Sequence, residues 1–237
     1  MSTLSASATP VLTRLPVALE EVSVDLEARA DPACAKYVLI ATRGTNEPQA
    51  PTAQLTGMSN YTLGNITGGI AYQTVYPAGD NTQQIGADDI VRRIEQGLTD
   101  CPSQKYVLLG YSQGATATTL ALTNYTNTAS AGYKAIAGVL LIGNPAKLSY
   151  KISNVDQLGG SLTNSTNGVY STSQQPIPSA WYSSKTLDIC YVDDLVCNGL
   201  NFWSIINAFA NHQKYYQASV QNIGAAHLIK QLKAALA

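Results

Sequence analysis

The hydrophobic positions of this chain fall into short, nearly continuous apolar runs that are separated by polar stretches. Apolar runs of this length, rich in β-branched residues, predict buried strands. The four strongest are KYVLIATRG (36–44), KYVLLGYS (105–112), KAIAGVLLIGNP (134–145) and KTLDICYVDDLVC (185–197). A fifth, GIAYQTVYPAGDN (69–81), ends in turn-forming residues. Because these runs are apolar on both faces, we expect helices to cover both faces of the sheet.

An amphipathic helix is predicted for GADDIVRRIEQGLTDCP, residues 86–102. Ile90, Ile94 and Leu98 recur every four residues and would share one face of the helix, and Pro102 ends it.

Two further helices and the order of the elements predict the fold class. Small residues in QGATATTLALTNY (113–125) predict a helix that packs close to a sheet, and residues 217–237 predict a closing helix. We expect irregular chain or a weakly marked helix at 45–69, and loops at 146–185. The alternation of strands and helices predicts an α/β fold with a mostly parallel central sheet.

Composition narrows the possible functions. The 237 residues are 45% hydrophobic and 12% charged, with a formal net charge of −1. Such a chain can form one sizeable core, so we expect a single domain over residues 31–237. A basic stripe is missing, which argues against a nucleic-acid partner, and no apolar run reaches the 18 or so residues that span a membrane. Without a heptad pattern or an obvious apolar patch, we expect a monomer.

The N-terminal 30 residues predict a leader or propeptide rather than part of the domain. Residues 1–19 lack the basic start and the apolar stretch of a signal peptide. We expect a secreted protein whose signal is absent from this chain; the alternative is a protein that is not secreted. The acidic stretch EEVSVDLEAR then resembles a propeptide with a candidate cleavage point after Arg29. Glycosylation sequons support secretion weakly; they lie at Asn60, Asn65, Asn124 and Asn164.

Four cysteines, Cys34, Cys101, Cys190 and Cys197, favour two disulfides. Three connectivities are possible, and sequence distance favours a local Cys190–Cys197 bridge and a long-range Cys34–Cys101 bridge. By chain entropy the long bridge contributes about 4 kcal/mol and the short one about 2.5 kcal/mol. The alternative is four buried thiols in a cytosolic protein. Zinc binding is disfavoured because the chain has two histidines and no C-x-x-C pair.

Ser112 is the candidate nucleophile. In GYSQG it lies between a predicted strand and a predicted helix, as a nucleophile elbow requires. Gly110 and Gly114 leave room for this crowded turn, and the helix N-terminus offers N–H groups to an oxyanion. The alternative is an ordinary serine N-cap between glycines.

A serine nucleophile needs a base and a carboxylate that orients the base. His212 lies in a predicted loop, where catalytic groups are common, whereas His227 lies inside the closing helix. Asp193 and Asp194 both follow the last strand, within the Cys190–Cys197 loop. The chain order Ser112, Asp194, His212 is that of the α/β hydrolases.

These residues resemble the fungal cutinases and cutinase-like esterases, which have the α/β-hydrolase fold. The resemblance covers about residues 34–236. It rests on Cys34 before VLIATRGTNEP, Cys101 before KYVLLGYSQG, LLIGNP, and CYVDDLVC followed by His212.

The resemblance implies a role for each matching residue. Ser112 would be the nucleophile, His212 the base and Asp194 the acid, while Thr45 and the N–H of Gln113 would form the oxyanion hole. It also implies pairing of the first two and of the last two cysteines, an exposed nucleophile and no metal or other cofactor.

The chain departs from the best-known cutinases at two places. Asp193 stands where glycine usually precedes the catalytic aspartate, which leaves open whether the roles of Asp193 and Asp194 are exchanged. The segment between Cys197 and His212 is longer and more apolar, and it could line an acyl-binding groove, form a flap or pack on the core. Its apolar residues are Phe202, Trp203, Ile205, Ile206 and Phe209.

We therefore predict a secreted serine esterase that acts on cutin, on short- to medium-chain acyl esters and on aliphatic polyesters. Acetylxylan esterases share the framework and are the alternative, because the ANHQKYY segment resembles theirs. A non-enzymatic surface protein on the same scaffold would have no need of Ser112, Asp194 and His212 together.

Overall fold

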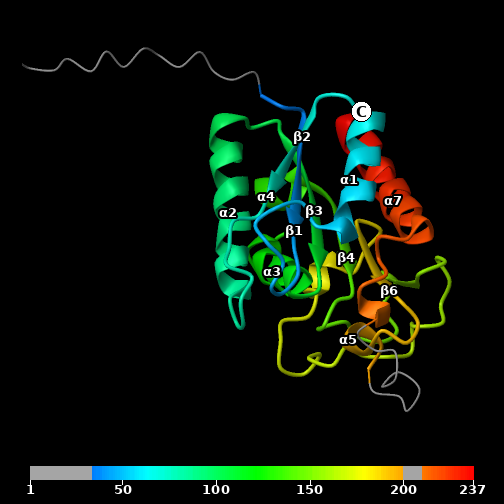
Figure 1. Ribbon diagram of the computed structural model, residues 1–237. Coiled ribbons are helices and arrows are strands. Elements are labelled where there is room, and N and C mark those ends of the chain that lie inside the picture. The colour runs from blue at the N-terminus through cyan, green and yellow to red at the C-terminus, as the bar shows by residue number, and fades with distance from the viewer. Residues whose placement is uncertain (1–33, 200–209) are drawn as a thin grey trace, which may run out of the picture. The chain divides into compact units, whose positions relative to one another are not determined.

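A single six-stranded sheet forms the centre of the protein (Figure 1). The computed structural model describes residues 34–199 and 210–237. The strand order is β2-β1-β3-β4-β6-β5, and every neighbouring pair is parallel. The strands are β1 (Tyr37–Thr42), β2 (Gly69–Gln73), β3 (Lys105–Tyr111), β4 (Ile136–Ile142), β5 (Asn154–Asp156) and β6 (Thr186–Cys190). The predicted α/β class with a parallel sheet is confirmed.

Helices cover both faces of this sheet (Figure 1). On one face α1 (Ala53–Asn65) packs against α7 (Ala218–Leu236), and on the other α2 (Gln83–Asp100) packs against α3 (Gln113–Leu122). The shorter elements are α4 (Ala131–Ala135), α5 (Leu195–Asn198), and the 3-10 helices η1 (Thr123–Tyr125) and η2 (Ser179–Trp181). Within the described ranges, no helix is both long and apolar enough to cross a membrane.

The two faces of the sheet bury separate apolar cores, which explains why the strand sequences are apolar throughout. Successive side chains of a strand point to opposite faces. Leu39 therefore joins the core beneath α1 and α7, together with Met58 and Leu228. Its neighbour Ile40 joins the core beneath α2 and α3, together with Ile94.

The predicted elements differ from the structure mainly in the polar regions. The weakly marked 45–69 region contains α1, whose N-cap Thr52 accepts a hydrogen bond from the Gln54 N–H. The assignment of 146–185 to loops was wrong in part, because β5 and η2 lie there. β5 is a three-residue edge strand, and its sequence, Asn-Val-Asp, is too short and too polar to produce an alternating pattern.

The parallel topology brings the candidate site residues to one edge of the sheet. Ser112 follows β3 directly, and Asp194 follows β6 after a three-residue turn. Thr45 follows β1 closely. Because the carboxyl ends of parallel strands meet at the same edge, the fold alone brings segments about 150 residues apart in sequence to one cleft.

Asp188 is a fully buried carboxyl group in the middle of β6, and it should make stability depend on pH. Asn144 Nδ2 donates to its Oδ2 at 2.8 Å, but burial raises the Asp188 pKa to about 6. The folded protein therefore keeps a proton that the unfolded chain releases between about pH 4 and 6.

The stability contribution of this proton is present below about pH 4 and is lost as the pH rises through about 6. We expect the Asp188→Asn variant to gain about 3 kcal/mol of unfolding free energy over wild type between pH 4 and 7. Urea unfolding at several pH values measures the difference, and parallel curves for the two proteins would contradict it.

Candidate active site

Ser112 occupies a strained turn between β3 and α3. Its backbone has φ 54° and ψ −120°, a left-handed conformation that is costly for a residue with a side chain. Such strain is typical of the strand-to-helix turn that presents a nucleophile. Ser112 caps α3 by position, but its side chain makes no capping hydrogen bond. The hydroxyl group is therefore available for another partner.

Two glycines allow this turn because backbone atoms approach them closely. A Cβ on Gly114 would lie 2.1 Å from Thr42 O and 2.5 Å from Arg43 O. A Cβ on Gly110 would lie 2.6 Å from Gly114 O. The first turn of α3 thus lies directly against the end of β1, which brings the helix N-terminus next to the loop that carries Thr45.

Ser112, His212 and Asp194 lie in one line of contacts. His212 Nε2 is 2.9 Å from Ser112 Oγ. On the other side of the ring, His212 Nδ1 is 3.1 Å from Asp194 Oδ1 and 2.9 Å from Oδ2. Asp194 is 0% exposed and His212 is 8% exposed. This arrangement can move a proton from the serine hydroxyl to the imidazole while a buried carboxylate holds the ring.

The second histidine lies elsewhere. His227 Nε2 is 3.1 Å from Lys185 O, and burial lowers the His227 pKa. His212 itself closes a short helical turn at residues 210–212, so the expected loop was wrong at this point.

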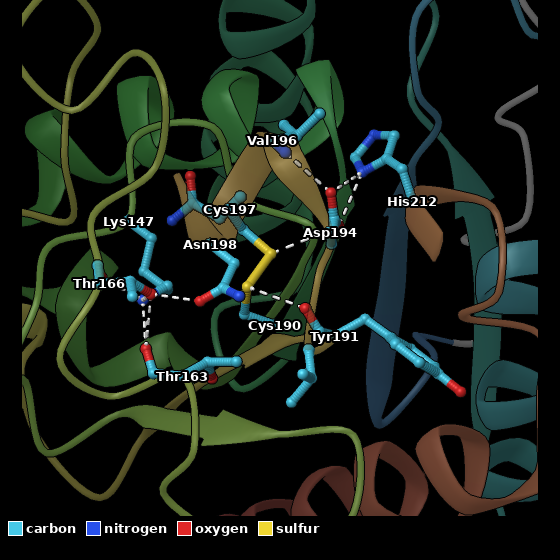
Figure 2. Close-up of a disulfide and its surroundings, with 12 residues drawn as sticks. Lys147, Thr163, Thr166, Cys190, Tyr191, Asp194, Val196, Cys197, Asn198 and His212 are labelled. Carbon is cyan, nitrogen blue, oxygen red and sulfur yellow. Dashed lines mark hydrogen bonds and ion pairs between the residues drawn. A yellow bond between two sulfur atoms is a disulfide. The ribbon is translucent and has the colours of Figure 1, made fainter. Parts of the chain in front are cut away.

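The turn that carries Asp194 is held by the Cys190–Cys197 disulfide (Figure 2). The bridge spans seven residues and closes the chain between the end of β6 and α5. Cys197 Sγ lies 3.3 Å from Asp194 Oδ2, and the Val196 N–H donates to Asp194 Oδ1 at 2.9 Å. The predicted pairing is confirmed for this bridge and for Cys34–Cys101, which joins the chain before β1 to the end of α2.

A buried lysine lies on the other side of the disulfide from His212 (Figure 2). The Lys147 ammonium group is fully buried and donates to Thr163 O at 2.8 Å and to Thr166 O at 2.5 Å. Thr166 Oγ1 in turn donates to Asn198 Oδ1 at 2.6 Å, at the end of α5. Burial lowers the Lys147 pKa. These bonds connect the long β4–β6 connection to the segment that follows Asp194.

The loop that carries Thr45 is held by the buried guanidinium group of Arg43. Arg43 Nε donates to Glu47 O at 2.8 Å, and Nη2 donates to Tyr76 O. The Gly44 N–H donates to Glu47 Oε2 at 2.6 Å, which closes the turn on both sides of Thr45. A rigid loop of this kind can hold a donor at a set distance from the nucleophile.

Thr45, Ser112, Gln113 and His212 line one cleft of about 940 Å³. Gln113 is the first residue of α3, so its N–H belongs to the first turn, where helical partners are missing. Polar side chains dominate the rest of the lining, among them Asn46, Asp80, Asn81, Gln83, Ser173 and Gln174. The predicted acyl-binding residues Phe202, Trp203, Ile205, Ile206 and Phe209 lie outside the described residues.

Three residues that contact His212 or Asp194 were not predicted. Tyr111 donates to His212 O at 2.9 Å, and Tyr215 donates to Asp194 Oδ2 at 2.6 Å. Gly143 lies against the imidazole, because a Cβ there would be 2.8 Å from His212 Cε1. Sequence signals existed for two of them: Gly143 belongs to LLIGNP, and Tyr215 is one of the aromatic residues just after His212.

Comparisons with known proteins show the family of this chain. The sequence profile of the family described as Cutinase matches residues 33–232. The chain belongs to the cutinase family.

This cutinase-family chain is similar to a carboxylesterase and to solved structures of a cutinase-like protein and an acetyl xylan esterase. Carboxylesterase Culp1 of Mycobacterium tuberculosis is 32% identical over 179 residues, which cover 73% of this chain and 72% of Culp1. The solved structure of a cutinase-like protein from Cryptococcus sp. is 40% identical, with a TM-score of 0.76 over 85% of this chain and 97% of that one. The fold is shared with the catalytic core domain of acetyl xylan esterase from Trichoderma reesei. That structure is 23% identical, with a TM-score of 0.65 over 84% of this chain and 99% of the esterase core.

Asp193 is a departure of this chain from the cutinase pattern, and its backbone explains why glycine fits there. Its φ is 62°, in the left-handed region that glycine adopts without strain. The structure places Asp194, not Asp193, against His212 Nδ1. The exchange of roles that the sequence left open is therefore not supported by the contacts.

Proposed function

We propose that this cutinase-family protein is a secreted serine hydrolase of carboxylic esters. The observation that carries the proposal is the chain of contacts from Ser112 Oγ through His212 to the buried Asp194 carboxylate, 2.9 Å at each step. The chain belongs to a family whose relatives include a carboxylesterase. The two disulfides support an oxidising, extracellular environment.

In the first half of the reaction Ser112 Oγ attacks the ester carbonyl carbon while His212 Nε2 accepts its proton. The N–H of Gln113 and Thr45 stabilise the negative charge on the former carbonyl oxygen. The C–O bond to the alcohol then breaks, and the alcohol leaves with the proton that His212 returns. The acid remains bound to Ser112 as an ester.

The second half repeats these steps with water. His212 accepts a proton from the attacking water, the Ser112–acyl bond breaks, and the proton returns to Ser112 Oγ as the carboxylic acid leaves. Asp194 holds the Nδ1 proton throughout and stabilises the imidazolium ion that forms at each step.

The proposed substrates are cutin, short- to medium-chain acyl esters and aliphatic polyesters. Ser112 lines the cleft and is partly exposed among the described residues, which supports access of an ester to its hydroxyl group. We propose a single domain over residues 31–237 that acts as a monomer and without a cofactor.

A second candidate is deacetylation of a plant polysaccharide. The described part of the cleft favours it, because amide and acid groups such as Asn46, Asp80, Asn81 and Gln174 line the region around Ser112. A hydroxylated alcohol group could bind there through hydrogen bonds, and an acetyl group needs little apolar space.

The acyl-chain preference separates the two candidates. On p-nitrophenyl esters from acetate to palmitate we expect kcat/KM to peak at butyrate to hexanoate and to fall at palmitate. A peak at acetate with little activity beyond it would favour the polysaccharide deacetylase. An absence of hydrolysis across the series would contradict the proposed function.

A further inference from the structure

Tyr215 follows His212 by three residues and lies against the proposed catalytic groups. It is 0% exposed and lies three residues before the first residue of α7, Ala218. Its ring stands at 86° to the His212 imidazole with the centroids 6.2 Å apart. A Cβ on Gly143 would lie 3.1 Å from Tyr215 Cε2 and 2.8 Å from His212 Cε1. The two side chains therefore pack over the same glycine.

The direction of the Tyr215 hydroxyl proton follows from its partners. The Tyr191 N–H donates to the hydroxyl oxygen at 3.0 Å. An N–H can only donate, so the hydroxyl proton must point to another group. Asp194 Oδ2 is 2.6 Å away, whereas Cys197 Sγ, a weaker acceptor, is 3.3 Å away. The proton is therefore donated to the carboxylate.

Tyr215 keeps this proton across the pH range of ester hydrolysis. Burial, and then the negative charge of Asp194, raise the Tyr215 pKa well above its usual value. The hydroxyl group is thus a permanent donor to Asp194.

The Asp194 carboxylate therefore accepts hydrogen bonds from three donors, Val196, His212 and Tyr215. Oδ1 accepts from the Val196 N–H at 2.9 Å, and His212 Nδ1 lies within 3.1 Å of both oxygens. Oδ2 is shared by His212 and Tyr215. A hydrogen bond to the charged form of a carboxylate stabilises that form. The bonds from the Val196 N–H and the Tyr215 hydroxyl group also fix the orientation of the Asp194 carboxylate plane.

We propose that Tyr215 is a positioning residue for the proposed Ser112–His212–Asp194 mechanism, on which this inference rests. Its hydroxyl group holds the Asp194 carboxylate at hydrogen-bond distance from His212 Nδ1. It also takes up part of the carboxylate charge, which sets how strongly Asp194 favours the imidazolium form of His212.

Removal of the hydroxyl group should change the pH profile of ester hydrolysis. In the Tyr215→Phe variant Asp194 Oδ2 loses its hydrogen bond from the tyrosine hydroxyl group. The carboxylate charge is then less neutralised, and it attracts the imidazolium form of His212 more strongly. The acid limb of the kcat/KM profile should then move to higher pH, by about half a unit. The plateau kcat should fall about tenfold because the carboxylate is less well held, with KM within about twofold of wild type.

Other charged and titratable groups face His212, and the variant leaves them unchanged. Glu47 and Asp80 line the same cleft as His212, and the Tyr111 ring has its centroid 5.1 Å from that of the imidazole. Nearby in sequence, Lys214 Nζ donates to Asn211 Oδ1, and Asp193 precedes Asp194. A difference between the two profiles therefore reports on the Tyr215 hydroxyl group.

Tyr37→Phe is the matched control. Tyr37 is also fully buried in the core beneath α1 and α7, and its hydroxyl donates to Ile66 O at 2.8 Å. The Tyr37→Phe variant should lower the melting temperature about as much as Tyr215→Phe does, and it should leave the pH profile of ester hydrolysis unchanged. If Tyr215→Phe has the wild-type acid limb and rate, or if Tyr37→Phe moves the limb equally, the role of Tyr215 is overturned.

A measurement on the wild-type protein tests the inference should Tyr215→Phe fail to fold. By proton NMR we expect a slowly exchanging, downfield Tyr215 hydroxyl proton with a cross-peak to the Nδ1 proton of His212. A Tyr215 hydroxyl signal without that cross-peak would overturn the inference. Ser112→Ala separates the two claims: full activity in that variant contradicts the proposed function, whatever Tyr215 does.

Discussion

Replacement of Ser112 by alanine is expected to lower kcat for p-nitrophenyl butyrate by about 10⁴- to 10⁶-fold. The variant lacks the oxygen that would carry the acyl group, while His212 and Asp194 keep their contact with one another. The strained turn at residue 112 is allowed by the close backbone approaches at Gly110 and Gly114, and both glycines remain in the variant. We therefore expect the free energy of unfolding to change by less than about 1 kcal/mol.

Rate measurement and covalent labelling together check this expectation. Diethyl p-nitrophenyl phosphate should transfer its diethylphosphoryl group to Ser112 Oγ in the wild type and release p-nitrophenolate. Mass spectrometry should find the added mass on the Ser112 peptide and no such mass in the variant. A variant with the wild-type rate, or a label on another residue, would contradict Ser112 as the proposed nucleophile. An unfolded variant would contradict the expectation that Ser112→Ala changes the free energy of unfolding only slightly.

The second large effect is expected from Gly114→Ala, which should destabilise the protein by about 3 kcal/mol or more. The new Cβ would lie 2.1 Å from Thr42 O and 2.5 Å from Arg43 O, and both atoms belong to the backbone. The start of α3 must then move away from β1. Because Ser112 and the Gln113 N–H lie at that start, ester hydrolysis should fall together with stability.

Gly64→Ala is the control for this substitution. Gly64 lies in α1, and apart from its chain neighbours and the backbone of its own helix no described heavy atom comes within 4 Å of a Cβ placed there. Alanine is favoured over glycine inside a helix, so we expect a gain of about 0.5 to 1 kcal/mol and unchanged activity. Thermal and urea unfolding of the two variants provide the comparison. Similar effects at both positions would show that the close approach at Gly114 does not matter.

The sheet and the candidate site could be predicted from sequence where their signals are local. Continuous apolar runs marked β1, β3, β4 and β6, and a glycine on each side of Ser112 marked the strand-to-helix turn. The contact of Ser112, Asp194 and His212 was expected from chain order, because the topology of this fold brings the ends of β3 and β6 together. The disulfide pairing followed from sequence distance.

The residues that hold the site in place, such as Tyr111 and Arg43, could not be predicted from sequence. Each acts through isolated contacts with residues that are distant along the chain. The hydrogen bond from Tyr111 to His212 O joins residues 101 apart in sequence, and the bond from Arg43 to Tyr76 joins residues 33 apart. Neither makes a periodic pattern. Tyr215 was visible as an aromatic residue near His212, but the identity of its hydrogen-bond acceptor depends on the folded turn at Asp194.

The all-parallel sheet has a consequence for biosynthesis. Parallel strands cannot pair as hairpins, so each pairing waits for a distant segment, and sheets of this kind fold late and slowly. The proposed base follows the proposed nucleophile by 100 residues, and it is placed only when β6 has joined the sheet and the chain before α7 has folded beside it. A nascent chain still on the ribosome would therefore carry the nucleophile without its base. The proposed ester hydrolysis would therefore begin only after the whole chain has been synthesised.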